Sequence, residues 1–215
     1  MEKTNKGFDY WTQFFTNKGY AVLQMDYRGS VGYGFDFMQQ GFGSWGQAMQ
    51  NDIEDGTRWL INQKIADEDK ICIVGASYGG YAALMGVIKT PDLYQCVVSY
   101  AGITDINALV ESKRYFRGYE LNKKILGDDY YKLWEASPLK HTDKINVPVL
   151  LVHGTKDLAV KVSHSVKIFD KLAGKKKTVQ YVEIDKADHS LSNNAHRIKA
   201  FTAIDSFLDK YLPVN

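Results

Sequence analysis

The stretch that decides the fold is Lys70-Ile71-Cys72-Ile73-Val74-Gly75-Ala76-Ser77-Tyr78-Gly79-Gly80. Its first half is a short apolar run rich in β-branched residues, which predicts a buried strand that ends near Ala76. Its second half begins a segment of small and apolar residues, which predicts a helix over 79–89 that stops before Pro91. The two halves meet at Ser77 within a G-x-S-x-G motif. The stretch therefore predicts a strand, a sharp turn that carries a serine, and a helix.

The same alternation continues along the chain. Short apolar runs of strand length are Tyr20–Asp26, Lys70–Ala76, Gln95–Tyr100, Val147–Val152 and Thr178–Ile184. Segments with helical spacing lie between and around them, at Phe8–Asn17, Gln47–Gln63, Gly79–Lys89, Ser163–Leu172 and Asn194–Leu212. Continuous apolar strands that alternate with helices predict an α/β fold, in which a mostly parallel sheet has helices on both faces.

A length of 215 residues favours a single domain over 1–215. One connection is longer than the loops usual in such folds, namely the segment 101–146 between the third and fourth predicted strands. It is rich in aromatic and arginine side chains, which are Arg114, Tyr115, Phe116, Arg117, Tyr119, Tyr130, Tyr131 and Trp134. Insertions of this length usually form helices of their own. Two interpretations stand, a lid or pocket wall over a site, or a helical excursion packed on the sheet edge.

The composition excludes several classes of protein. Hydrophobic residues at 45% and charged residues at 24% are typical of a soluble globular protein, and a net charge of +2 is too small for a dedicated nucleic-acid binder. No run approaches the roughly 18 apolar residues of a membrane-spanning helix. Residues 1–8 contain no apolar signal region. We therefore expect a cytoplasmic protein with no nucleic-acid or membrane partner.

Neither a cofactor nor a metal ion is expected. Cys72 and Cys96 form no paired motif and no cluster with histidine, so they predict buried thiols and not a disulfide framework or a zinc site. The stretch Gly41-Phe42-Gly43-Ser44-Trp45-Gly46 has the glycine spacing of a dinucleotide-binding loop. No predicted strand leads into it, which argues against that function. Its glycines predict a tight turn around Trp45.

Ser77 is the candidate nucleophile. A sharp turn exposes its oxygen, and the N-terminus of the following helix supplies backbone N–H donors for a developing oxyanion. Serine is a weak nucleophile near neutral pH, so it needs a base and a carboxylate that orients the base. Two loops after predicted strands supply these groups. Asp157 follows the strand at 149–152, and His189 follows the strand at 179–184.

Other histidines and carboxylates are weaker candidates. The remaining histidines fit structural positions: His153 at a strand end with a backbone hydrogen bond, His164 and His196 in helices, and His141 before a strand. Asp185 and Asp188 adjoin His189 in sequence, but the chain would have to fold back for either to reach its ring. Asp157 and His189 are therefore the preferred acid and base.

Four motifs occur in order along the chain: Asp26-Tyr27-Arg28-Gly29-Ser30 with Gly32-Tyr33-Gly34, then Gly75-Ala76-Ser77-Tyr78-Gly79-Gly80-Tyr81, then His153-Gly154-Thr155-Lys156-Asp157, and then Asp188-His189. From Trp11 onward, the chain resembles the catalytic domain of prolyl oligopeptidase-type serine peptidases, relatives of dipeptidyl peptidase IV and acylaminoacyl peptidase. The resemblance implies an α/β-hydrolase fold with Ser77, Asp157 and His189 as a triad. It also implies hydrolysis of peptide or acyl bonds through an acyl-enzyme on Ser77.

The resemblance implies further roles around the triad. The backbone N–H of Tyr78 belongs to the oxyanion hole. Aromatic side chains line the pocket for the residue before the scissile bond, with Tyr81 and, from the long insertion, Tyr115 as candidates. Apart from the resemblance, Arg114 and Arg117 are candidates for binding a substrate carboxylate, with a solvated surface as the alternative. No cofactor is implied, because the chemistry needs only protein groups and water.

The sequence departs from this family at its N-terminal side. Members carry a β-propeller and three strands ahead of the one predicted at Tyr20–Asp26, and this sequence starts too late to include them. In the family's sheet, the third of those strands lies between 20–26 and 70–76. Its absence predicts one of two outcomes. Either the two flanking strands pair directly in a five-stranded sheet, or an open edge remains that favours a homodimer by strand pairing, or aggregation.

Two classes of function follow. The first is a serine hydrolase acting on a peptide or a small acyl substrate, with carboxylesterase-like activity as a variant because no propeller restricts access. The second is a non-catalytic hydrolase fragment that dimerises through an exposed strand edge. Ser190 follows His189 where relatives usually have glycine, a change expected to alter the loop without removing the base.

Overall fold

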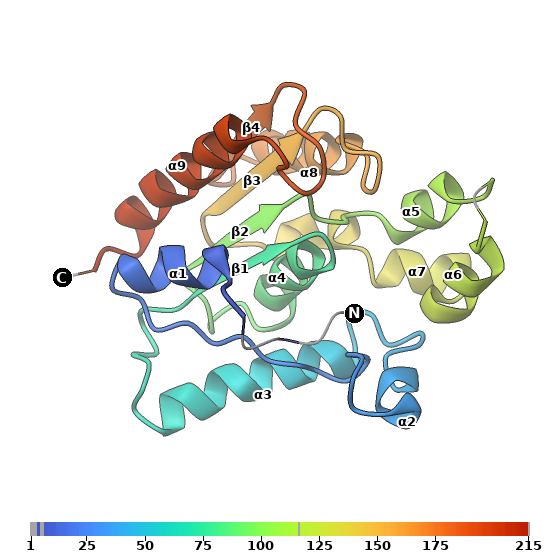
Figure 1. Cartoon of the computed structure of the whole chain (residues 1–215), viewed down its shortest axis with the longest axis horizontal. Coiled ribbons are helices and arrows are strands. Elements are labelled where there is room, and N and C mark those ends of the chain that lie inside the picture. Colours follow the sequence, from blue (N-terminus) through green and yellow to red (C-terminus); the bar gives the residue numbers. More distant parts are fainter. Residues whose placement is uncertain (1–3, 5–6, 116, 215) are drawn as a thin grey trace.

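A computed structural model describes residue 4 and residues 7–115 and 117–214. Its sheet has four parallel strands in the order β1 (Cys72–Ala76), β2 (Cys96–Tyr100), β3 (Val149–Gly154) and β4 (Val179–Ile184) (Figure 1). Helices alternate with these strands along the chain. The structure therefore confirms the predicted α/β class with a parallel sheet.

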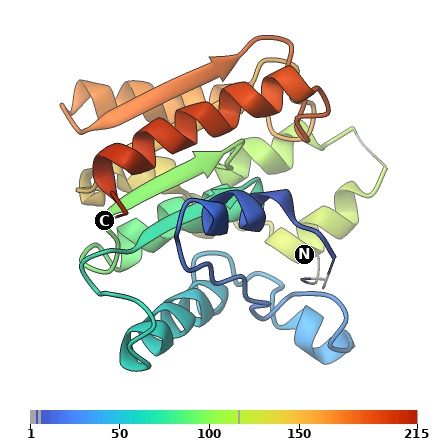
Figure 2. The same cartoon turned by 60° about the vertical axis from the view of Figure 1, so that its left-hand side comes forward.

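Helices cover both faces of the sheet. α4 (Tyr78–Lys89) and α8 (Ser163–Gly174) lie on one face, and α1 (Tyr10–Asn17) and α9 (Asn194–Tyr211) lie on the other (Figure 1, Figure 2). Each face of the sheet has its own hydrophobic core. Successive residues of a strand pack in different cores, because strand side chains alternate between the two faces. For example, Val97 packs in the core under α4 and α8, and Val98 packs in the core under α1 and α9. Both strands at the centre, β2 and β3, are fully buried.

The five predicted helices are confirmed within two residues at each end. α3 (Ala48–Asn62) is the fifth, and it packs beside α4 next to β1. Local chemistry explains the bounds of α1. The Asp9 carboxylate accepts a hydrogen bond from Thr12 N at 2.8 Å and caps the N-terminus, and Gly19 follows the helix with φ of 94°. A short helix α2 (Phe35–Gln39) precedes α3.

The connection between β2 and β3 forms helices, as the sequence predicted. They are α5 (Ile106–Ser112), α6 (Tyr119–Leu126), α7 (Tyr130–Glu135) and the 3₁₀ segment η1 (Pro138–Lys144). η1 packs against α4 and α8 on the sheet. α5, α6 and α7 lie beyond the ends of the strands, on the side toward which the strands point (Figure 1). This segment therefore places helices next to the carboxyl edge of the sheet.

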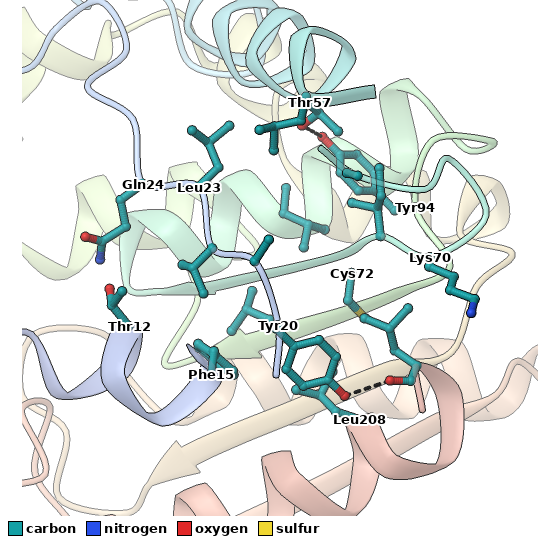
Figure 3. A pocket seen from close by; sticks show the side chains of 18 of the residues that line it. Thr12, Phe15, Tyr20, Leu23, Gln24, Thr57, Lys70, Cys72, Tyr94 and Leu208 are labelled. Carbon is teal, nitrogen blue, oxygen red and sulfur yellow. Dashed lines mark hydrogen bonds between the residues drawn. The ribbon is translucent and has the colours of Figure 1, made fainter. Parts of the chain in front are cut away.

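The prediction of a fifth strand at Tyr20–Asp26 is wrong. The segment is extended but pairs with no strand, and together with β1 it lines a cavity of about 660 Å³ (Figure 3). Several of its contacts lie with other parts of the chain. The Tyr20 hydroxyl donates to Leu212 O at 2.7 Å, and Met25 lies against Gly56 of α3, where a Cβ atom would overlap it.

Direct pairing of 20–26 with β1, the first of the two outcomes considered, is therefore wrong as well. Within the described residues, β1 has a strand neighbour on one side only, which is β2. The cavity is lined mainly by apolar side chains, including Phe15, Val22 and Leu208. The open edge of β1 faces this cavity.

The prediction of two free thiols is also wrong. Cys72 and Cys96 are direct partners in the β1–β2 register, with Cα atoms 4.8 Å apart, and they form a disulfide. Parallel pairing explains this, because partner residues point to the same face within disulfide reach. The sequence shows neither which strands are neighbours nor their register.

In the part of the chain described, no helix is long and apolar enough to cross a membrane.

Candidate active site

Ser77 lies at the turn between β1 and α4, where the backbone is strained. Its φ of 57° and ψ of −117° are unusual for a residue with a side chain. The turn is held from both sides, since Ser77 N donates to Tyr100 O at 2.8 Å and Ser77 O accepts from Tyr81 N at 3.1 Å. The side chain is partly exposed. The fold thus fixes this hydroxyl at the carboxyl edge of the sheet.

Glycines allow this turn because the backbone passes very close to itself. A Cβ atom on Gly75 would overlap the backbone of Gly79, and a Cβ atom on Gly80 would overlap Gly102 and the Ser99 side chain. By contrast, a Cβ atom on Gly79 would meet nothing within 4 Å. The first glycine of the G-x-S-x-G motif is therefore required by the close approach of strand and helix.

We expect Gly75→Ala to lower the melting temperature by roughly 2 to 12 °C, because relieving the overlap with Gly79 costs about 1–3 kcal/mol of stability. Gly79→Ala is the matched control. It fills open space within a helix, where alanine is favoured, so no loss of stability is expected. Thermal unfolding followed by circular dichroism measures both. Equal melting temperatures for the two variants would contradict this account of the turn.

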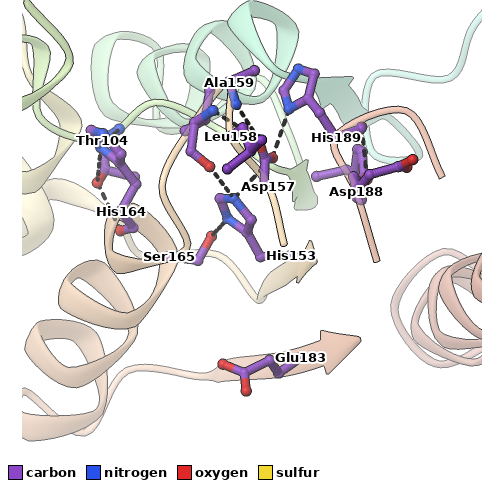
Figure 4. Close-up of polar contacts among 12 residues, drawn as sticks. Thr104, His153, Asp157, Leu158, Ala159, His164, Ser165, Glu183, Asp188 and His189 are labelled. Atoms are coloured by element: carbon purple, nitrogen blue, oxygen red, sulfur yellow. Dashed lines mark hydrogen bonds and ion pairs between the residues drawn. The ribbon is translucent and has the colours of Figure 1, made fainter. Parts of the chain in front are cut away.

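Asp157 follows β3, and its side chain is fully buried. Its Oδ1 accepts hydrogen bonds from Ala159 N and Val160 N, both at 2.8 Å. Its Oδ2 lies 2.6 Å from His189 Nδ1 and 3.2 Å from His153 Nε2 (Figure 4). Burial acts to raise the pKa of Asp157, but the hydrogen bonds from these two rings and from Val160 outweigh it and lower the pKa. The carboxylate is therefore ionised at neutral pH.

His189 lies in the loop after β4 with 27% of its side chain exposed. Because Nδ1 faces an ionised carboxylate, Nδ1 carries the proton and Nε2 is left with a lone pair. The loop is fixed by Tyr100, whose hydroxyl is 3.1 Å from Asp188 O and 2.8 Å from His189 O. The neighbouring carboxylates bond elsewhere, as expected. Asp188 accepts from Ser192 N, and Asp185 accepts from the Thr155 hydroxyl.

The structure therefore brings Asp157 and His189 into direct contact. Ser77 lies at the same carboxyl edge of the sheet, because all three residues follow parallel strands. Among the described residues, no hydrogen bond joins the Ser77 hydroxyl to the His189 ring. Such contacts are often long in a site without substrate and tighten when substrate binds.

The other candidate site residues are distributed differently. Tyr78 is the first residue of α4, a position at which backbone N–H groups have no acceptor within the helix. Tyr81 is fully buried, and its hydroxyl donates to Ala136 O at 2.9 Å, so its side chain belongs to the core. Tyr115 is 93% exposed, and Arg117 is also exposed. Neither Tyr115 nor Arg117 lines the cavity beside β1.

The glycine-rich stretch 41–46 forms the predicted turn around Trp45. The indole packs on the rings of Tyr78 and Tyr81, with centroids 4.6 and 4.8 Å away. A Cβ atom on Gly46 would press on the Tyr81 hydroxyl, which explains the glycine. Among the residues the structure describes, no three histidine, cysteine or acidic side chains are grouped to hold a metal ion.

Two of the remaining histidines, His164 and His153, are buried. His164 in α8 is buried, which lowers its pKa to about 4, and its Nδ1 accepts from Thr104 N at 3.2 Å. His153 does bond to a backbone oxygen, that of Val160. Its contact with Asp157 was not foreseen. The only signal in the sequence is the spacing of four residues between His153 and Asp157, which many unrelated pairs share.

A strained serine between a parallel strand and a helix, with an aspartate and a histidine on later strand ends, defines the α/β-hydrolase class. The chain belongs to the prolyl oligopeptidase family, whose model matches residues 6–214. Dipeptidyl aminopeptidase BIII of Pseudoxanthomonas mexicana is 36% identical over 214 residues, which cover 96% of this chain and 31% of that protein.

Solved structures agree with this assignment. A puromycin-hydrolyzing peptidase of Mycobacterium tuberculosis superposes with a TM-score of 0.82 and 28% identity, over 88% of this chain and 29% of that one. Acylaminoacyl peptidase of Pyrococcus horikoshii gives a TM-score of 0.78 and 26% identity, over 88% and 32%. The chain thus spans about a third of the length of the relatives it matches.

Proposed function

We propose that the chain is a serine peptidase in which Ser77, His189 and Asp157 act as nucleophile, base and orienting acid. The observation that carries this proposal is the 2.6 Å contact between His189 Nδ1 and the buried Asp157 carboxylate, at the sheet edge that also holds the strained Ser77. A base whose Nε2 keeps its lone pair and a hydroxyl fixed at the same edge are what acyl transfer requires.

The proposed reaction proceeds in two halves. Ser77 Oγ attacks the carbonyl carbon of the substrate while His189 Nε2 takes the hydroxyl proton. The oxyanion that forms accepts a hydrogen bond from the backbone N–H of Tyr78. The intermediate collapses when His189 gives that proton to the leaving amine, which leaves an acyl group on Ser77. Water then attacks this ester by the same route, with His189 again as base, and releases the acid.

Peptides and acylated amines are the proposed substrates. The relatives named above are a dipeptidyl aminopeptidase, a puromycin-hydrolyzing peptidase and an acylaminoacyl peptidase. The helical segment 101–146, of which α5 to α7 lie beside the carboxyl edge of the sheet, is proposed as a wall of the substrate site (Figure 1). Within it, Tyr115 and Arg117 are exposed, so their side chains can reach a substrate. The side chain of Tyr81 is buried, which makes it a weaker candidate for such a contact.

Labelling with a fluorophosphonate tests the nucleophile in the folded 215-residue chain. We expect one phosphonyl group per chain, which mass spectrometry of a digest places on the peptide containing Ser77. Serine is phosphonylated by such reagents only when a base activates it. Heat-denatured protein serves as the control and should remain unlabelled. A chain that melts cooperatively but takes no label would contradict the proposal and favour the non-catalytic alternative.

The open edge of β1 supports a second proposal, that the chain pairs with another copy of itself. In the β1–β2 ladder, Gln95 N donates to Ile71 O and Ser77 N donates to Tyr100 O, so the N–H of Val74 points to the other side. Unpaired strand edges favour such association. Analytical ultracentrifugation of the wild type should then give the mass of a dimer. A mass equal to that of a single chain would contradict this proposal.

A further inference from the structure

The ring of His153 is fully buried at the end of β3, four residues before Asp157. Its Nδ1 is 2.8 Å from Ser165 Oγ in α8. Its Nε2 is 2.9 Å from Val160 O and 3.2 Å from Asp157 Oδ2 (Figure 4). Both ring nitrogens therefore have partners. The Asp157 carboxylate lies between two imidazole rings, that of His153 and that of His189.

The partners determine which nitrogen of His153 carries the proton. A backbone carbonyl oxygen can only accept, so Nε2, which faces Val160 O, is protonated. Nδ1 is then the acceptor for the hydroxyl of Ser165. Nε2 also lies 3.2 Å from Asp157 Oδ2. His153 thus presents a fixed donor to the carboxylate.

The two carboxylate oxygens of Asp157 are held in different ways. Oδ1 accepts from the amides of Ala159 and Val160, which belong to the same turn. Oδ2 meets only side chains, namely His153 and His189, among the described residues. Without His153, the only side chain on Oδ2 among the described residues would be His189, which is itself partly exposed.

We propose that His153 is a positioning residue. Its Nε2–H holds Asp157 Oδ2 in the orientation in which this oxygen accepts from His189 Nδ1, and it braces the turn 157–160 through Val160 O. This inference rests on the proposed function, since it concerns the orienting acid of the same site. A ring held by Ser165 on rigid α8 provides a fixed support of the kind that precise catalytic geometry needs.

The electrostatics around the carboxylate agree with this role. Burial opposes ionisation of Asp157, yet the donors around it, with His153 first among them, lower its pKa. Two other titratable groups interact with Asp157, namely Tyr100 and, in α8, His164. The pKa of His164, about 4, keeps it neutral at pH 7, so it adds no charge to the pair. The ring of His153, together with His189 and the Val160 amide, therefore favours the ionised form of Asp157.

A matched pair of variants tests the donor. In His153→Gln the amide nitrogen takes the place of Nε2 and can still donate, whereas His153→Met has the same length and no donor. We expect His153→Met to lower kcat by about 10- to 100-fold with KM within about twofold. His153→Gln should restore kcat to within about threefold of the wild type. His153→Asn, whose amide reaches only the place of Nδ1, keeps the Ser165 contact and should behave like His153→Met.

A second measurement does not depend on turnover. The low-field proton NMR signal of the His189 Nδ1–H in the folded chain should persist in His153→Gln and be lost or shifted in His153→Met and His153→Asn. The proposal would be overturned if His153→Met and His153→Asn kept the wild-type kcat and an unchanged NMR signal. It would also be overturned if His153→Gln lost as much kcat as His153→Met.

The proposal can still be tested if one variant does not fold or if the proposed function fails. If His153→Met does not fold by circular dichroism, the pair His153→Gln and His153→Asn makes the same comparison. If the folded wild type takes no fluorophosphonate label, the proposed function has failed separately. The NMR signal then still decides whether His153 orients Asp157.

Discussion

Replacing Ser77 with alanine is expected to lower kcat for hydrolysis of a p-nitrophenyl ester by at least about 10⁴-fold. The physical reason is that no acyl-enzyme can form without the hydroxyl, so that the two-step route is lost. The Tyr78 amide and the binding surface would still stabilise an oxyanion formed by water, which leaves a small residual rate. Ester hydrolysis followed by absorbance measures the effect.

Ser44→Ala is the control for this prediction. Ser44 lies in the glycine-rich turn, where its hydroxyl donates to Gln40 O at 2.7 Å, and it has no part in the proposed reaction. Its variant should hydrolyse the ester at the wild-type rate. A Ser77→Ala chain that keeps more than about a tenth of the wild-type kcat would show that another group is the nucleophile.

Replacing Asp157 with asparagine is expected to lower kcat by about 10⁴-fold. The amide has nearly the same shape, so the turn at 157–160 is retained. An amide nitrogen in place of Oδ2 would donate toward His189 Nδ1 and so favour the tautomer in which Nε2 carries the proton. A protonated Nε2 cannot take the proton of Ser77. The loss therefore falls on kcat, with little change in KM.

Asp185→Asn is the matched control. Asp185 is an exposed carboxylate in the same loop as His189, and it contacts the Thr155 hydroxyl instead of the ring. Wild-type kcat is expected for this variant. If Asp157→Asn hydrolysed the ester as fast as Asp185→Asn does, the acid would have to be another residue, and Asp157 would be a structural carboxylate.

The fold was predictable where local signals agree. Each strand that the structure contains is a short apolar run, and each of the five predicted helices has apolar positions at helical spacing. The segment 20–26 has the same apolar character as a strand, but its neighbour in space decides whether it pairs. Apolar content alone cannot distinguish a paired strand from an extended segment that packs on helices.

Some residues of the candidate site were also predictable from local signals, and others were not. G-x-S-x-G next to a strand located the turn of Ser77, and Asp157 and His189 were found because each directly follows a strand. By contrast, Tyr81 was a pocket candidate only through the family resemblance. One helical turn after Ser77, its side chain points into the core beside Trp45. Proximity in sequence does not determine the direction of a side chain.

By itself, the sequence determined the parallel α/β architecture, the strained serine turn and the order of the three candidate catalytic residues. These depend on periodicity and on residues within a few positions of one another. Only the tertiary structure decided the open edge of β1, the Cys72–Cys96 disulfide and the contact of His153 with Asp157. Each of these depends on which strands and loops become neighbours, and that follows from packing of the whole chain.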